Sequence, residues 1–202
     1  MAQTFSELLA PHPDSAPAIG APGRAWLSYG GLRTLSTDVR AALRAAGVGP
    51  KDRVAIVLPN GPEMATAFAT IAQAATTAPL NPAYKEDEFA FYLEDLGARA
   101  IVLAADEDGP ALRAARRFGL IVLRVAVPDG AAAGAFDLMA ENPGAPVSDG
   151  TPDADDVALV LHTSGTTSRP KIVPLLQSNV VASARNVADS LALSDRDRCL
   201  NV

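Results

Sequence analysis

The 202-residue chain is poor in the residues that build covalent or metal-based scaffolds. It has one cysteine and two histidines, which excludes an internal disulfide framework and leaves little material for a structural zinc site. We expect the single cysteine, Cys199, to be a small buried residue. Lysine is also scarce, because only Lys51, Lys85 and Lys171 contribute to the 17 basic side chains. Each lysine therefore needs separate attention.

Long apolar runs are absent as well. The longest are short stretches such as Ala100–Ala105 and Leu120–Leu123, whereas a membrane-spanning helix needs about 20 apolar residues. The first residues lack the basic end and apolar core of a secretory signal. We therefore expect a cytoplasmic protein without a membrane span.

The charge balance restricts the class of partner. The net charge of -6 argues against a nucleic-acid binder that works through bulk positive charge. Residues 157–202 nevertheless carry five basic and three acidic side chains, against 12 and 20 in the first 156 residues. This least acidic region leaves room for a small basic pocket that holds one phosphate-bearing ligand.

Two hydrophobic periodicities alternate along the chain. Apolar residues three and four apart between Leu32 and Leu43 indicate one face of a helix, and the short apolar run Val54–Leu58 indicates a strand buried on both faces. A helix that opens with the acidic residues 86–88 follows the same pattern. The further predicted strands are Thr77–Leu80, Ala100–Leu103, Leu120–Val125, Val157–Leu161 and Ile172–Leu176. The alternation predicts an α/β fold, with a mainly parallel sheet flanked by helices.

Residues 128–152 break this alternation. The segment is rich in Ala, Gly, Pro and Asp, and we interpret it as a surface excursion with a short helix near Phe136–Met139. A sub-domain boundary within 128–152 is the alternative.

The chemistry-bearing segment is the loop Thr163–Lys171, which directly follows a predicted strand. Gly165 allows close backbone approach to a ligand, and Lys171 adds a positive charge. Hydroxyl groups and backbone N–H donors beside an ammonium group suit a polyphosphate. The hydroxyl-bearing residues at the start of the loop are Thr163, Ser164, Thr166 and Thr167.

Composition alone leaves the role of this loop open. Stretches rich in Ser, Thr and Gly are also typical of solvated turns. The loop has one glycine and a Pro-Lys ending, so it is not a Walker motif, and the chain has neither a Rossmann fingerprint nor a nucleophile elbow. His162, beside the loop, is interpreted as a strand-end residue with local hydrogen-bond partners.

The string Val-Leu-His-Thr-Ser-Gly-Thr-Thr-Ser-Arg-Pro-Lys, residues 160–171, resembles the signature loop of the adenylate-forming superfamily. The members of this superfamily are acyl-CoA synthetases, peptide-synthetase adenylation domains and firefly-type luciferases. The segments Leu27–Gly30, Ala45–Asn60 and Pro79–Pro82 resemble the family's N-terminal region. The resemblance covers nearly the whole chain and implies that residues 1–202 are an incomplete N-terminal AMP-binding domain, without the C-terminal domain.

The resemblance implies two-step chemistry. A carboxylate attacks the α-phosphate of ATP to give an acyl-adenylate and pyrophosphate, and a thiol, commonly that of coenzyme A, then takes the acyl group. Mg²⁺ would bridge the phosphates, with no ligand from this segment. Lys171 would act in catalysis by supplying positive charge as pyrophosphate leaves, or would anchor the loop. The residues expected to hold the nucleotide are Thr163, Ser164, Gly165, Thr166, Thr167, Ser168 and Lys171.

Two positions depart from the common family pattern. Ser168 stands where most members have glycine, and Ile172 stands where a glycine commonly follows the lysine. The sub-group that resembles oxalyl-CoA synthetases shares the Thr-Ser-Arg-Pro-Lys string. This similarity favours a small dicarboxylate as the acid substrate.

The acyl pocket, the ribose-binding aspartate and the C-terminal catalytic lysine of the family have no counterpart in these residues. We therefore expect a fragment that is inactive alone, with exposed apolar surface that favours self-association. We also expect the loop 163–171 to be poorly ordered without ligand. The alternatives are a non-catalytic remnant that serves as a binding or assembly module, and an unrelated phosphotransferase.

Overall fold

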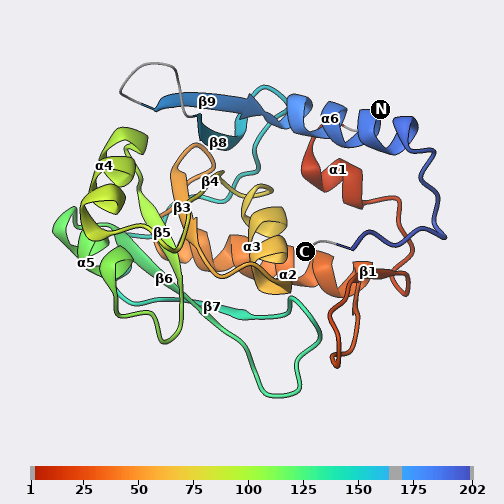
Figure 1. The fold of residues 1–202 in the computed structure, drawn as a ribbon, viewed down its shortest axis with the longest axis horizontal. Helices are drawn as coiled ribbons and strands as arrows, with labels where there is room; N and C mark the ends of the chain where they lie inside the picture. Colours follow the sequence, from red (N-terminus) through yellow and green to blue (C-terminus); the bar gives the residue numbers. More distant parts are fainter. Residues whose placement is uncertain (1–2, 164–169, 201–202) are drawn as a thin grey trace.

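The computed structural model describes residues 3–163 and 170–200. These residues form a seven-stranded sheet, ordered β7-β6-β5-β3-β4-β8-β9, and a separate β1-β2 hairpin (Figure 1). The strands are β1 (Pro17–Ile19), β2 (Leu27–Ser28), β3 (Arg53–Val57), β4 (Thr76–Pro79), β5 (Ala100–Ala104), β6 (Ile121–Ala126), β7 (Asp137–Ala140), β8 (Val157–Thr163) and β9 (Lys171–Leu176). The helices are α1 (Phe5–Leu9), α2 (Tyr29–Ala45), α3 (Pro62–Ile71), α4 (Glu86–Leu96), α5 (Pro110–Arg117) and α6 (Gln177–Ser190).

The main sheet is parallel at its centre and antiparallel at both edges. Strands β6, β5, β3, β4 and β8 run parallel, whereas β7 and β9 pair antiparallel with β6 and β8. This arrangement confirms the predicted α/β class and explains why Val54–Val57 of β3 and all of β5 are apolar. In β3, for example, Val54 and Ile56 enter one core while Ala55 and Val57 enter the other.

Each core lies between the sheet and a pair of helices. Helices α2 and α3 cover one face, and the predicted apolar stripe of α2 is buried there. Helices α4 and α5 cover the other face, where Phe89, Leu93 and Leu96 are buried. Helix α4 ends at Gly97, whose φ of 56° is the left-handed conformation that glycine adopts most easily. These layers hold the described strand ends in fixed positions.

The helix predicted near Phe136–Met139 is wrong. Residues 137–140 form β7, which pairs antiparallel with β6 from Leu123↔Ala140 to Ala126↔Asp137. The strand forms because the otherwise open edge of β6 supplies backbone hydrogen-bond partners that a four-residue sequence pattern does not reveal. The segment after β7 turns back onto α2, where Gly144 N–H donates to Ala46 O at 2.9 Å.

The C-terminal part of the described chain begins at the β8–β9 hairpin and continues into α6, which packs against α1 (Figure 1). Gln177, the first residue of α6, is buried and bridges two other elements. Its Oε1 accepts from Phe5 N–H at 3.2 Å, and its Nε2 donates to Ala72 O at 2.6 Å. Cys199 is exposed rather than buried, because it lies in the tail beyond α6 and no element covers it. No described helix combines the length and apolarity needed to cross a membrane.

Candidate functional site

The β8–β9 hairpin brings the two ends of the predicted loop together. Thr163 is the last residue of β8, Lys171 is the first residue of β9, and the two are register partners. Opposite residues of an antiparallel pair have Cα atoms about 4.5–5.5 Å apart. Both residues are exposed, so their side chains are accessible to a ligand. The other predicted site residues, Ser164, Gly165, Thr166, Thr167 and Ser168, lie outside the described residues, and the predicted disorder of the loop is therefore untested.

We call the Thr163–Lys171 pair the hairpin mouth. It lies at the carboxyl end of β8, which runs parallel to β4. β8 continues the direction of β4 and is anchored by the buried Val160 in the core below α4 and α5. The hydroxyls of Thr76 and Thr77 reinforce the joint, because each donates to a carbonyl oxygen of β8 at 2.7 Å. Ligands of open α/β sheets bind beyond the carboxyl ends of the strands. The position of the mouth is therefore compatible with a ligand site.

Charge at the mouth is favourable to an anion. Lys171 projects from the start of β9 and forms no ion pair with the residues that the structure describes. Its ammonium group and the Thr163 hydroxyl are both donors to phosphate oxygen. These two groups are the part of the predicted donor set that the described residues bring together.

His162 directly precedes Thr163 in β8, and its side chain contacts α4, which covers one face of the sheet. Its side chain is only 8% exposed, and its Nε2 lies 3.1 Å from Asp95 Oδ2 on α4. The ring also contacts Tyr92 edge-on, with a centroid distance of 4.7 Å. His162 is a strand-end residue with a hydrogen-bond partner, as expected, but this partner is not local in the sequence. Sequence reasoning missed Asp95 and Tyr92, which lie far away in the chain and carry no motif.

The acidic run at the start of α4 is a helix cap. Glu88 accepts from Lys85 N–H at 2.9 Å, and Glu86 pairs with Arg113 at 2.7 Å. Negative side chains in the first turn also complement the helix dipole. Across residues 3–163 and 170–200, no group of three or more His, Cys, Asp or Glu is placed to hold a metal ion.

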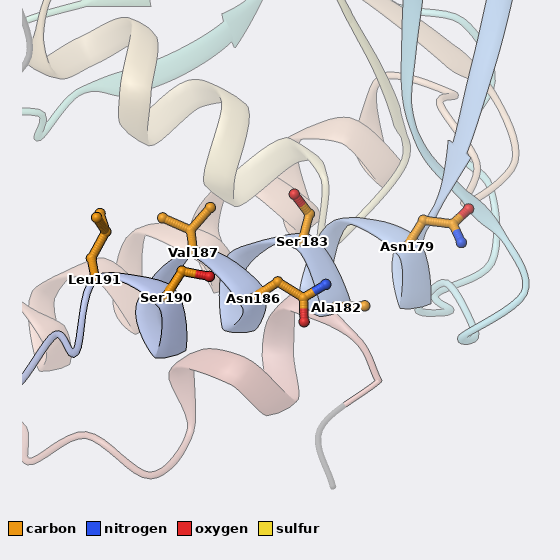
Figure 2. A pocket seen from close by; sticks show the side chains of 7 residues that line it. All are labelled: Asn179, Ala182, Ser183, Asn186, Val187, Ser190 and Leu191. Atoms are coloured by element: carbon orange, nitrogen blue, oxygen red, sulfur yellow. The ribbon is translucent and has the colours of Figure 1, made fainter.

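Two depressions lie along α6. One of about 570 Å³ runs along the helix, and of the seven side chains labelled in Figure 2, six come from α6 and the seventh, Leu191, directly follows it. They mix small polar groups such as Ser183 with the exposed Val187 and Leu191. A second depression of about 360 Å³ lies between α6 and the hairpin and is lined by Leu159, Leu175, Asn179, Val180, Ser183 and Ala184.

The family model that describes AMP-binding enzymes matches residues 5–202. The chain belongs to this family. Among its members, an oxalate–CoA ligase of Arabidopsis thaliana is 36% identical over 195 residues, which span 89% of this chain and 36% of that protein. An oxalate–CoA ligase of Saccharomyces cerevisiae is 36% identical over 193 residues, which span 84% of this chain and 35% of that protein.

Solved structures agree with the family assignment. The crystal structure of ATP-bound MatB from Rhodopseudomonas palustris superposes with a TM-score of 0.72 at 25% identity, and the match covers 94% of this chain and 38% of that one. The chain therefore spans little more than a third of the length of the AMP-binding relatives that it matches.

Proposed function

We propose that residues 1–202 are the incomplete N-terminal AMP-binding domain of an AMP-forming acid–CoA ligase, in which the loop from Thr163 to Lys171 holds the phosphates of ATP. The observation that carries this proposal is the pairing of Thr163 with Lys171 at the carboxyl end of β8. It gathers a hydroxyl and an ammonium group at the base of a segment that is rich in further donors. The relatives that are named as CoA ligases support the same reaction class.

The residues of the mouth would act on the leaving group. Negative charge increases on pyrophosphate as a carboxylate attacks the α-phosphate, and fixed donors that face this charge lower the barrier. Thr163, Ser164, Thr166, Thr167 and Ser168 would donate hydrogen bonds from hydroxyl groups, and Gly165 would admit the phosphates close to the backbone. Lys171 would supply the positive charge.

The residue types of this segment also indicate which ligands other parts of the enzyme would have to bind. The segment from Thr163 to Lys171 contains no carboxylate, whereas Mg²⁺ is usually held by carboxylates together with the substrate phosphates. Mg²⁺ would therefore be held by the phosphates and by groups beyond this segment. Coenzyme A and the acid would likewise be held by groups beyond this segment.

The acid is proposed to be a small dicarboxylate. The support is the Thr-Ser-Arg-Pro-Lys string that includes Ser168, together with two relatives named as oxalate–CoA ligases. We further propose a cytoplasmic location and no activity of residues 1–202 alone, because the reaction also needs the acid and the α-phosphate held in line. Exposed apolar surface along α6 is proposed to support self-association.

Pyrophosphate exchange in the complete ligase tests the role of the mouth. Lys171→Ala should slow exchange about 10- to 100-fold, because it removes a charge that acts mainly in the transition state. The matched control is Lys85→Ala, which removes an exposed lysine at the start of α4. Exchange at the parental rate in Lys171→Ala would remove Lys171 from the mechanism. Robust exchange by residues 1–202 alone would overturn the account of an incomplete domain.

A further inference from the structure

The outer end of β8 extends beyond the strand that supports it. The register pair between β4 and β8 is Thr77↔Leu159, and β4 ends at Pro79, two residues further on. β8 continues for four residues after Leu159, to Thr163. The threonine hydroxyls that reinforce this joint bond Val157 and Ala158, at the inner end of β8. Within the described chain, the outer end of β8 is thus paired with β9 and not with β4.

At this outer end, β8 is held by a side-chain contact between His162 and α4. Asp95 lies in the last turn of α4, and a carboxylate only accepts hydrogen bonds, so His162 Nε2–H donates across 3.1 Å. The contact is well shielded on the histidine side, where 8% of the side chain is exposed, although Asp95 is 39% exposed. A hydrogen bond to a charged acceptor is stronger than one between neutral groups.

An aromatic stack supports the same ring from below. His162 contacts the Tyr92 ring edge-on, and Tyr92 stacks on Tyr84 with centroids 4.9 Å apart. Tyr84 in turn meets Phe89, which is buried in the core between α4 and the sheet. The histidine is therefore connected to the rigid part of the molecule by a continuous series of packed rings.

We infer that the His162–Asp95 pair is a positioning device. It fixes where the hairpin mouth lies relative to α4, and it thereby places the donor groups of Thr163 and Lys171. His162 precedes Thr163 in β8, and its register partner Ile172 follows Lys171 in β9, so a displacement of this pair moves both donors together. The inference rests on the proposed function for its effect on ATP. The mechanical part, that α4 holds the mouth, stands independently of any ligand.

Hydrogen exchange tests the mechanical part without ligand. His162→Phe keeps a ring against Tyr92 but removes the N–H donor, and Asp95→Ala removes the acceptor. Both should speed amide exchange about tenfold or more in Leu161–Thr163 and Lys171–Val173, while Val157–Leu159 keeps its protection. The control is Glu94→Ala, because Glu94 is an exposed acid beside Asp95 on the same helix. Unchanged exchange at the mouth, or equal loosening along all of β8, would overturn the inference.

Steady-state kinetics of the complete ligase test its consequence. Asp95→Ala and His162→Phe should raise KM for ATP about tenfold and lower kcat by less, because the donors are retained but misplaced. Asp95→Asn should keep KM for ATP and kcat close to the parental values, since an amide oxygen also accepts a hydrogen bond from His162. If Asp95→Ala has parental kinetics while Lys171→Ala is slowed, the positioning role is rejected and the proposed phosphate site is kept. Parental kinetics in Lys171→Ala would reject the proposed phosphate site instead, and hydrogen exchange would still decide how the mouth is held.

Discussion

Thr163 and Lys171 are opposite each other in the outermost register pair of the β8–β9 hairpin. The segment between them therefore leaves and re-enters the sheet at one point. A hydroxyl from one strand and an ammonium group from the other share that point, which lies where a parallel strand ends. The two ends of the segment rich in Ser, Thr and Gly therefore lie together at this end of the hairpin.

An engineered cross-link should report this pairing. The positions of Thr163 and Lys171 match the Cα separation that a disulfide requires, so Thr163→Cys with Lys171→Cys should oxidise readily. The exposed Cys199 is first replaced by serine to prevent wrong pairing. Mass spectrometry after mild oxidation gives the yield of the bond. The matched control moves one cysteine out of register, to Val173, and a higher yield from this control would contradict the observed register.

Loss of the Gln177 side chain should destabilise the fold strongly for a single polar residue. Gln177→Ala leaves Phe5 N–H and Ala72 O without their buried partners, which costs about 1–3 kcal/mol of unfolding free energy. Urea denaturation measures the loss. Asn186→Ala, on the exposed side of the same helix, should change stability by less than about 0.5 kcal/mol. Equal effects of the two substitutions would show that the bridge contributes nothing.

The buried Arg44 should not tolerate replacement by lysine. Its guanidinium donates to Val48 O, Ala74 O and Gly150 O at 2.6–2.7 Å, and burial is the main cause that lowers the pKa of Arg44. A single ammonium group cannot reach three diverging carbonyls, so Arg44→Lys should cost about 1–3 kcal/mol of unfolding free energy.

Arg40→Lys serves as the matched control for Arg44→Lys. Arg40 lies one turn earlier on α2, where it is partly exposed and pairs with Asp149 at 3.4 Å. It should change the urea midpoint little, because partly exposed ion pairs contribute about 1 kcal/mol or less. A larger loss for Arg40→Lys than for Arg44→Lys would contradict this account of α2.

Alkaline pH should weaken the fold through Tyr84. A hydrogen bond with Tyr92, together with partial burial, raises the pKa of Tyr84 from 10.0 to about 12. Below pH 10 the phenol is protonated in both the folded and the unfolded chain, so its contribution to stability does not change with pH. Between pH 10 and 12 the unfolded chain loses this proton first, so folding stability falls as pH rises. Between pH 9 and 12 the melting temperature should fall less steeply with pH for Tyr84→Phe than for the parental chain. Identical slopes of melting temperature against pH would contradict the raised pKa of Tyr84.

The outer face of α6 should promote self-association of residues 1–202. Val187 and Leu191 are 51% and 66% exposed and lie in the depression shown in Figure 2. Replacing both with lysine should shift static light scattering at high concentration towards the mass of a monomer. Met139→Lys, which changes an equally exposed side chain on β7, should leave the scattering unchanged. A parental chain that scatters as a monomer would rule out this role for α6.

Local patterns were enough to predict the alternating elements. The apolar stripe of α2, the acidic first turn of α4 and the end of that helix at Gly97 all depend on residues within a few positions of each other. The same is true of the loop motif at Thr163–Lys171, whose residue types are recognisable without a structure. Periodicity and caps are short-range properties, so one sequence can display them.

Contacts between distant segments were decided only by the tertiary structure. Residues 137–140 became a strand because β6 offered an open edge, although their pattern favoured a helix. Cys199 is exposed because no element covers the tail, which its residue type could not indicate. Asp95 reached His162 only because α4 packs over the end of β8, 67 positions away in the chain. The sequence by itself determined which groups we propose to bind phosphate, whereas packing decided where Thr163 and Lys171 lie, because direction and distance arise from the layers that enclose the sheet.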